Sequence, residues 1–376
     1  METLVVFTNE LSPRASTTEE ERIAAEYLRT EFEAMGYDAS IQPFDVRVLS
    51  RAVPLLTITS PMKLDIEAVP MSMTTAGEAT AEFADVGKAL PSDISAEGLS
   101  GKIALIERGG ITFQEKITNV TEAGAVGAVV YNNEPGPFAG ALSEESSIPA
   151  MSISQEDGGA VKALMDDEAV TANITLIYTE NSQNVIADKP GTANDGRIVI
   201  LGGHYDTVPN VSGANDNGSG TATILTIARQ IADREYPFTV RFIAFGAEEL
   251  GLYGSKYYIS QLSAEETEST IAMLNFDALA TGPVTGILGT IELMKLVDSY
   301  AKENDIDVEM RFNLAAGTSS DHASFDQVGI PNVFFLGDDF SRIHTPEDTL
   351  EFVDPKLLGT SAALGIALLD ILAQEG

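Results

Sequence analysis

Residues 197–206, RIVILGGHYD, set the architecture that we expect for most of this chain. A short run of β-branched and apolar residues, followed by two glycines, is typical of a strand that is buried on both faces. The run ends in His204 and Asp206, which lie two positions apart and therefore share one face of a strand. A buried strand that carries titratable side chains at its end predicts a functional edge of a sheet.

The same alternation of buried strand and helix continues to the end of the chain. Further strands are predicted at 239–246, 271–279 and 331–337, and helices at 221–233, 255–262, 291–304 and 357–373. This alternation predicts an α/β fold with a largely parallel sheet, in which ligands bind beyond the carboxyl ends of the strands. We therefore expect the loops that follow these strands to meet around one crevice.

The first half of the chain has a different pattern. Residues 17–35 read as an amphipathic helix with a threonine cap, and residues 38–46 read as a strand. From about residue 50 to 178, short β-rich runs are separated by turn residues, with one clear helix at 113–125 and no histidine. We predict one domain made of residues 1–50 and 179–376, and a second domain of residues 51–178 inserted into it.

The composition argues against several classes of function. The 57 acidic and 22 basic residues give a net charge of −35, which would repel nucleic acids and anionic membranes. The absence of cysteine excludes disulfides, thiolate metal ligands and a cysteine nucleophile. A serine hydrolase is disfavoured because the chain has no G-x-S-x-G turn.

Two apolar segments bear on targeting. METLVVFTNELSPR at the start lacks the basic residues and the long apolar run of a signal peptide, so the chain is either cytosolic or lacks its leader. Residues 357–373 are apolar but contain Asp370, two glycines and small polar residues, and fall short of about 20 clean apolar residues. We expect a buried core helix there and no membrane association.

Histidines and carboxylates follow the predicted strands: His204, Asp216, Glu248, Glu249, Asp277 and His344. Two imidazoles and several carboxylates without a thiol suit zinc or a similar divalent metal. The set is too large for one catalytic zinc with an open position, and it suits two ions that share a carboxylate. Because neighbouring side chains alternate, one glutamate of the adjacent pair can bind an ion while the other faces water as a general base.

Two more carboxylates are expected to orient the imidazoles. Asp206 shares a strand face with His204 and can accept a hydrogen bond from the ring nitrogen that does not bind metal. Asp348 lies four residues after His344 and can do the same for that ring.

The motifs HYDTV, GANDNGSG, AFGAEELGLYGS, NFDALA and HTPEDT, in this order, resemble those of the M28 family of di-zinc metallopeptidases. The resemblance implies a three-layer αβα fold with a mixed, mostly parallel sheet, and a zinc exopeptidase, in the first place an aminopeptidase acting on peptides. It implies that Asp216 bridges two zinc ions, that Glu249 and His344 bind one, that His204 and Asp277 bind the other, and that Glu248 is the general base. It also implies a cis peptide between Asp216 and Asn217.

Residues of the inserted domain resemble a protease-associated (PA) domain. The stretches that carry this resemblance are 101–133, GKIALIERGGITFQEKITNVTEAGAVGAVVYNN, and 148–154, IPAMSIS. A PA domain ahead of the first metal ligand is a common M28 layout, which implies a role in substrate access and suggests an extracellular or periplasmic location.

The chain departs from the family pattern next to its last histidine. Many members have a tyrosine there that stabilises the oxyanion, whereas this chain has Ile343. His322, in SSDHASF, is our hypothesis for that role, and His322→Ala would leave turnover intact if the hypothesis were wrong.

Other functions of the same scaffold stay open at this point. A carboxypeptidase would use Arg311 or Arg342 for the substrate carboxylate, and a glutaminyl cyclase would use a single zinc. A non-catalytic receptor-like homologue would lack ligands or the base, which this chain retains. The sequence leaves the preferred N-terminal residue and the oligomeric state open.

Overall fold

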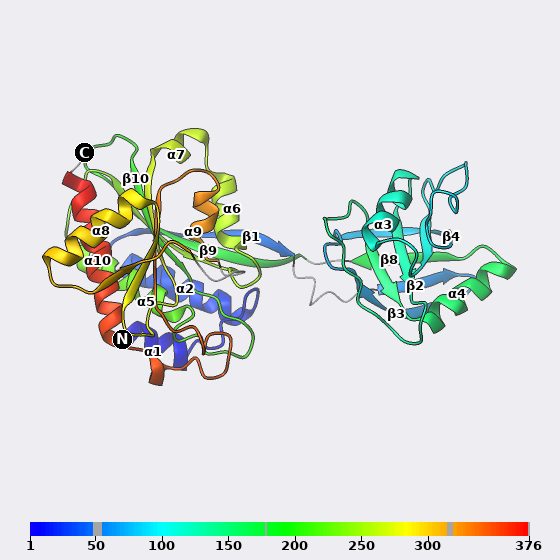
Figure 1. The fold of residues 1–376 in the computed structure, drawn as a ribbon, viewed down its shortest axis with the longest axis horizontal. Helices are drawn as coiled ribbons and strands as arrows, with labels where there is room; N and C mark the ends of the chain where they lie inside the picture. Colours follow the sequence, from blue (N-terminus) through cyan, green and yellow to red (C-terminus); the bar gives the residue numbers. More distant parts are fainter. Residues whose placement is uncertain (48–54, 177–178, 314–318, 375–376) are drawn as a thin grey trace. The chain divides into compact units, whose positions relative to one another are not determined.

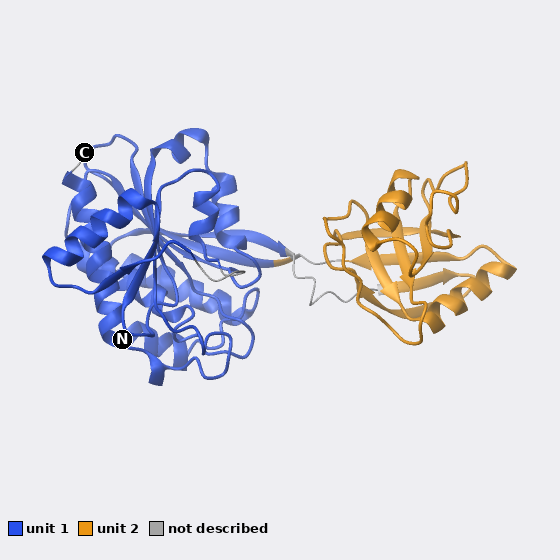
Figure 2. Cartoon of the chain, in the orientation of Figure 1, with its two compact units in different colours: residues 1–46, 181–376 blue, residues 47–180 orange. Residues whose placement is uncertain are grey.

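The computed structural model describes residues 1–47, 55–176, 179–313 and 319–374 (Figure 1). The chain forms two compact units, coloured separately in Figure 2. Unit 1 consists of Met1–Val46 and Asn181–Gly376, and unit 2 consists of Arg47–Glu180.

Unit 1 is built on an eight-stranded sheet. Its strands are β1 Asp38–Arg47, β9 Thr179–Lys189, β10 Ile198–His204, β11 Thr239–Phe245, β12 Thr270–Phe276, β13 Thr285–Gly289, β14 Val308–Met310 and β15 Asn332–Leu336, in the order β1-β9-β11-β10-β12-β15-β13-β14. The central strands β11, β10, β12 and β15 are parallel. β9 is antiparallel to β11, and β13 is antiparallel to β15. The sheet is therefore mixed, with a parallel centre.

Hydrophobic cores cover both faces of this sheet. In β10, Val199 and Leu201 belong to one core, and Ile198 and Ile200 belong to the other. This alternation with a period of two explains why residues 198–201 of the predicted strand are all apolar.

Helices complete the layers above and below the sheet (Figure 1). Those that contribute to the larger core are α1 Glu2–Asn9, α2 Glu19–Ala34, α5 Gly218–Ile231, α8 Ile291–Glu303 and α10 Pro355–Gln374. α6 Tyr253–Gln261 and α9 His322–Asp326 contribute to the core of the opposite face, while α7 Ala264–Ser269 leads directly into β12 and η2 Leu350–Phe352 precedes α10. The predicted three-layer αβα fold is confirmed.

Two helices show how local sequence and packing agree. Thr18 caps α2 by accepting a hydrogen bond from the Glu21 N–H at 3.3 Å, and Gly36 follows the helix with φ 87°. In the described part of the chain, α10 is the one helix long and apolar enough to span a membrane. Its apolar residues are largely buried where it packs on α5 and α8, as expected of a core helix.

Unit 2 is a closed barrel in the order β2-β3-β7-β6-β5-β4-β8. The strands are β2 Leu55–Ser60, β3 Leu64–Pro70, β4 Gly77–Asp85, β5 Ile103–Glu107, β6 Gly127–Tyr131, β7 Ala150–Ile153 and β8 Thr171–Leu176, and the helices are α3 Phe113–Glu122 and α4 Gln155–Asp167. Alternate residues again separate two cores, with Val129 in one and Val130, together with Val120 of α3, in the other.

Candidate metal centre

The loops at the carboxyl ends of three neighbouring strands bring the candidate residues together. His204 is the last residue of β10, and Asp277 directly follows β12. Two residues separate the end of β11 from the glutamate pair. Asp216 lies two residues ahead of α5. The site therefore occupies the edge at which ligands of parallel sheets bind.

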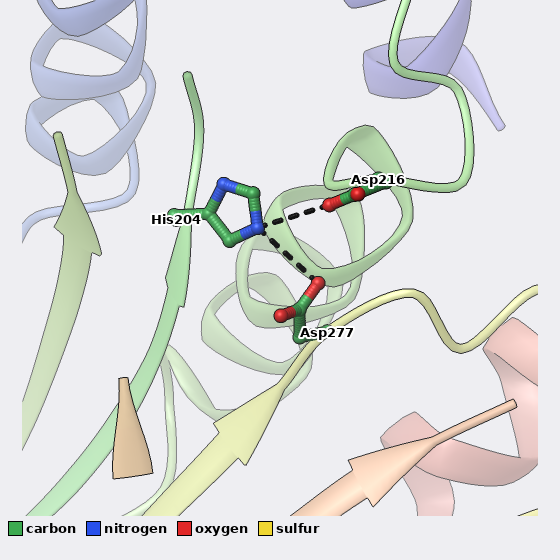
Figure 3. Close-up of side chains that lie close together, drawn as sticks. All are labelled: His204, Asp216 and Asp277. Carbon is green, nitrogen blue, oxygen red and sulfur yellow. Dashed lines mark hydrogen bonds and ion pairs between the residues drawn. The ribbon is translucent and has the colours of Figure 1, made fainter. Parts of the chain in front are cut away.

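A first group of coordinating side chains consists of His204, Asp216 and Asp277 (Figure 3). His204 Nε2 lies 3.1 Å from Asp216 Oδ1 and 3.3 Å from Asp277 Oδ1. All three side chains are buried. One nitrogen and two carboxylate oxygens facing a common point form a donor set that fits zinc.

A second group shares Asp216 with the first. His344 Nε2 lies 3.1 Å from Asp216 Oδ2 and 3.1 Å from Glu249 Oε2. Asp216 thus turns one carboxylate oxygen to each imidazole, which is the arrangement that a bridging ligand requires. In the described part of the chain, Glu249 Oε1 is buried without a hydrogen-bond partner, which also fits a cation at this place.

The electrostatics of the two groups are those of a cluster that lacks positive charge. Burial raises the pKa of Glu249 to about 7. Hydrogen bonds to Asp216 and Glu249 raise the pKa of His344 to about 10. Burial opposes the charge of His204, but Asp277 and neighbouring carboxylates more than offset it, so its pKa lies above the ordinary value. The raised pKa values mean that these groups retain protons, whose positive charge offsets the carboxylates as a bound metal ion would.

Glu248 is placed differently from its neighbour. Within the described residues it belongs to neither coordinating group. Burial raises its pKa well above the ordinary value; His204 opposes this shift, while Asp321 and Asp277 add to it. A carboxyl group of raised pKa beside the candidate ligands has the properties of a general base.

Asp348 contacts the backbone of Asp216 and its neighbour instead of the His344 ring. Its two carboxylate oxygens accept the backbone N–H groups of Asn215 at 2.7 Å and Asp216 at 3.0 Å. The expectation that Asp348 orients the His344 ring is therefore corrected. The Asp216–Asn217 peptide is cis, as the resemblance implies.

The Asp206 side chain has hydrogen-bond partners in addition to the predicted His204 ring. His204 Nδ1 lies 3.2 Å from the backbone carbonyl oxygen of Asp206 and 3.6 Å from its carboxylate. The carboxylate accepts the N–H groups of Glu248 at 3.1 Å and Glu249 at 3.3 Å, and the Ser16 hydroxyl at 2.5 Å. The Asp206 carboxylate thus lies beside the predicted ring nitrogen of His204, its backbone carbonyl oxygen is closer to that nitrogen, and its side chain also holds the glutamate turn.

Within the described residues, His322 belongs to neither coordinating group. Its ring stacks on Phe334 with centroids 4.6 Å apart, and burial lowers its pKa to about 4. It lines a cavity of about 240 Å³ together with Leu288 and Met294, and none of the candidate ligands among the described residues lines that cavity. These contacts do not test the oxyanion role, so that hypothesis stays a prediction.

Close backbone approach explains two glycines of the motifs. A Cβ on Gly203 would lie 2.5 Å from the carbonyl oxygen of Phe276, and a Cβ on Gly220 would lie 2.0 Å from the same atom. The two glycines therefore let β10 and α5 approach the end of β12, where Asp277 follows.

Three non-glycine residues at the site have left-handed backbone conformations. Ala247 precedes the glutamate pair with φ 50°, Ala278 follows Asp277 with φ 47°, and His344 itself has φ 61°. Such conformations cost about 1–3 kcal/mol each and are retained where the surroundings enforce them, often at functional sites.

Arg14 is a supporting residue that the sequence did not reveal. It is fully buried and donates to the backbone oxygens of Phe7, Tyr205 and Gly213 at 2.7–3.1 Å. Burial lowers its pKa to about 10, and the charge of Asp206 is the largest effect that opposes this shift. Nothing local distinguishes this arginine from a solvated one, because two of these three partners, Tyr205 and Gly213, lie 191 and 199 residues away in the sequence.

Comparisons with known proteins define the class. Residues 184–369 match the model of peptidase family M28, and residues 69–161 match the PA domain. Aminopeptidase YwaD of Bacillus subtilis (strain 168) is 32% identical over 364 residues, covering 93% of this chain and 78% of that protein. The chain belongs to peptidase family M28, which confirms the predicted family, inserted PA domain and peptide-bond hydrolase.

Another relative and two solved structures agree with this assignment. Leucine aminopeptidase 2 of Arthroderma otae is 35% identical over 265 residues, covering 68% of this chain and 52% of that protein. The chain thus spans about half the length of that fungal relative. BSAP, a zinc aminopeptidase from Bacillus subtilis, has a TM-score of 0.63 and 29% identity, covering 99% of this chain and 93% of that one. An aminopeptidase from Aneurinibacillus sp. strain AM-1 has a TM-score of 0.60 and 30% identity, with coverage of 99% and 92%.

Proposed function

We propose that this protein is an aminopeptidase that removes N-terminal residues from peptides and uses two zinc ions. The observation that carries the proposal is Asp216, whose two oxygens each lie 3.1 Å from the Nε2 atom of a different histidine. Relatives named aminopeptidases, and a solved structure named a zinc aminopeptidase, support the substrate class and the metal.

The ligand assignment follows the two groups of side chains. His204, Asp216 and Asp277 would hold one ion, and Asp216, Glu249 and His344 would hold the other. Bound zinc would supply Lewis-acid polarisation of the peptide carbonyl and a lower pKa for water. The site has two imidazoles and no thiolate, and this donor set fits that metal.

Glu248 moves the proton in this proposal. Its carboxylate takes a proton from the attacking water and delivers it to the leaving amine. The raised pKa that burial gives this group matches a residue that must hold a proton for part of the reaction. The surrounding carboxylates attract the protonated α-amine of a peptide and repel a C-terminal carboxylate.

A carboxypeptidase would need a free cation to bind the C-terminal carboxylate of its substrate, and neither Arg311 nor Arg342 is free to do so. Arg311 donates to the Gly337 carbonyl oxygen and to Asp338. Arg342 pairs with Asp339 and lies over the Phe352 ring. Both guanidinium groups already pair with carboxylates of the protein itself, which favours the aminopeptidase.

A substrate pair that differs only at the α-amine tests the proposal. We expect chromogenic aminoacyl substrates to be cleaved with a kcat/KM at least about 100-fold above that of their N-acetylated forms, because the site then loses the charged group that it recognises. Chelation should abolish the cleavage, and added zinc should restore it. Equal cleavage of the free and acetylated substrates would exclude an aminopeptidase.

Zinc binding should release protons. Without metal, the raised pKa values of about 7 for Glu249 and about 10 for His344 mean that both groups hold protons near neutral pH. The same shifts stabilise the metal-free protein at low pH, and this stabilisation is lost as the pH rises through those values. Zinc affinity should therefore increase with pH. Calorimetric titrations in buffers of different ionisation enthalpy measure the release, and equal heats would contradict it.

We also propose that the two units are separate domains, with boundaries near residues 47 and 180. Each unit has hydrophobic clusters of its own, which is the property expected of independently packed domains.

A further inference from the structure

Two buried carboxylates hold the backbone of the glutamate turn. Three successive N–H groups point to them: Ala247 donates to Glu21 Oε1 at 3.1 Å, while Glu248 and Glu249 donate to Asp206 at 3.1 and 3.3 Å. Ala247 has the left-handed φ of 50°, which exposes consecutive N–H groups to an anion. The turn that carries the proposed base and one proposed ligand is thus fixed through its backbone.

Glu21 is itself rigidly held. Its side chain is fully buried, and besides Ala247 it accepts the Ser182 hydroxyl at 2.7 Å and the Thr17 N–H at 2.6 Å. The contact with the turn is tight, since a Cβ on Gly246 would lie 2.9 Å from Glu21 Oε1. Small displacements of Glu21 would therefore be transmitted to the turn.

Burying this carboxyl group is costly for the fold. Burial and the charge of Asp206 raise the pKa of Glu21 to about 8, although three hydrogen bonds oppose the shift. A buried carboxyl group without an ion-pair partner among the described residues is weak evidence of a contribution to stability. Glu21 also lies in α2, outside residues 184–369 that match the peptidase family. These observations indicate a functional reason for the residue.

We propose that Glu21 is a positioning residue that fixes the Glu248–Glu249 turn through the Ala247 N–H. This inference rests on the proposed role of Glu248 as the base. The segment ahead of the inserted unit would then support the turn at two points. Glu21 accepts the Ala247 N–H group, and the Ser16 hydroxyl donates to Asp206.

The test is Glu21→Gln in the full-length, zinc-loaded protein, assayed at about pH 9 where the native carboxyl group is ionised. An amide has one acceptor oxygen, so either Thr17 or Ala247 must face an N–H group instead of an acceptor. We expect kcat to fall about 10–100-fold, the range typical of supporting residues at metal sites, with unchanged KM and zinc content. Glu31→Gln is the matched control, because it makes the same replacement in the same helix at a carboxylate that pairs with Arg229 at the surface, and its kcat should stay within about twofold.

The outcomes separate the inference from the proposed function. A wild-type protein without zinc-dependent aminopeptidase activity would refute the function itself. An active wild type with a normal kcat in Glu21→Gln would overturn the inference, and so would a lower melting temperature with an unchanged kcat per zinc-loaded molecule. If Glu21→Gln does not fold, Glu21→Asp is the second variant. It keeps a carboxylate, but the shorter side chain moves the carboxylate away from the Ala247 N–H group. Its kcat should then fall while its melting curve stays normal, and an unchanged kcat would refute the inference.

Discussion

Replacing Glu248 by glutamine is expected to lower kcat by about 10²–10⁴-fold, the usual contribution of general acid–base catalysis, while zinc binding persists. The amide has nearly the size of the carboxylate but cannot take a proton from water. Because Glu248 lies outside both coordinating groups in the described structure, its replacement removes no proposed ligand.

The neighbouring residue provides a matched comparison. Glu249→Gln replaces a carboxylate whose Oε2 lies 3.1 Å from His344 Nε2, and it should lower the zinc content as well as kcat. The measurements are steady-state kinetics and metal analysis of both variants. A zinc-depleted Glu248→Gln, or a fully active one, would contradict the different roles assigned to these adjacent glutamates.

Asp216→Asn is expected to cause the larger loss, because it affects both proposed ions. Each carboxylate oxygen faces the Nε2 atom of a different histidine, and asparagine offers an oxygen to only one of them. We expect kcat/KM to fall at least about 10³-fold and the zinc content to fall below one ion per chain.

Zinc content and kcat/KM of this variant are the readouts. Asp370→Asn is a suitable control, because Asp370 pairs with Arg234 and Tyr236, away from the site, and should leave activity unchanged. Retention of two zinc ions by Asp216→Asn would contradict its bridging role.

The sequence predicts the central elements well, because their signals are local. β10 begins with four consecutive apolar residues, and the strand lies in the middle of the sheet with both faces buried. β9, TENSQNVIADK, is largely polar and was not predicted, since its place beside β11 depends on tertiary pairing. β14 has only three residues and no recognisable period.

The residues that support the site show more clearly what cannot be predicted from the sequence. Spacing along the chain indicates the position of Asp206 beside His204, but it does not indicate that Asp206 and Asp348 accept backbone N–H groups of other loops. Spacing along one segment carries no information about such groups. Glu21 did leave a signal, because it falls on the same helical face as Ala24, Leu28 and Phe32, which are buried. A carboxylate on the apolar face of a helix is a buried polar group that needs a partner.

Anomalous diffraction at the zinc edge from crystals of the zinc-loaded protein tests the central claim most directly. We predict two peaks about 3.5–4 Å apart, the separation typical of two-metal sites. One peak should lie among His204, Asp216 and Asp277, and the other among Asp216, Glu249 and His344. A single peak, or peaks outside these two groups, would contradict a two-zinc centre bridged by Asp216.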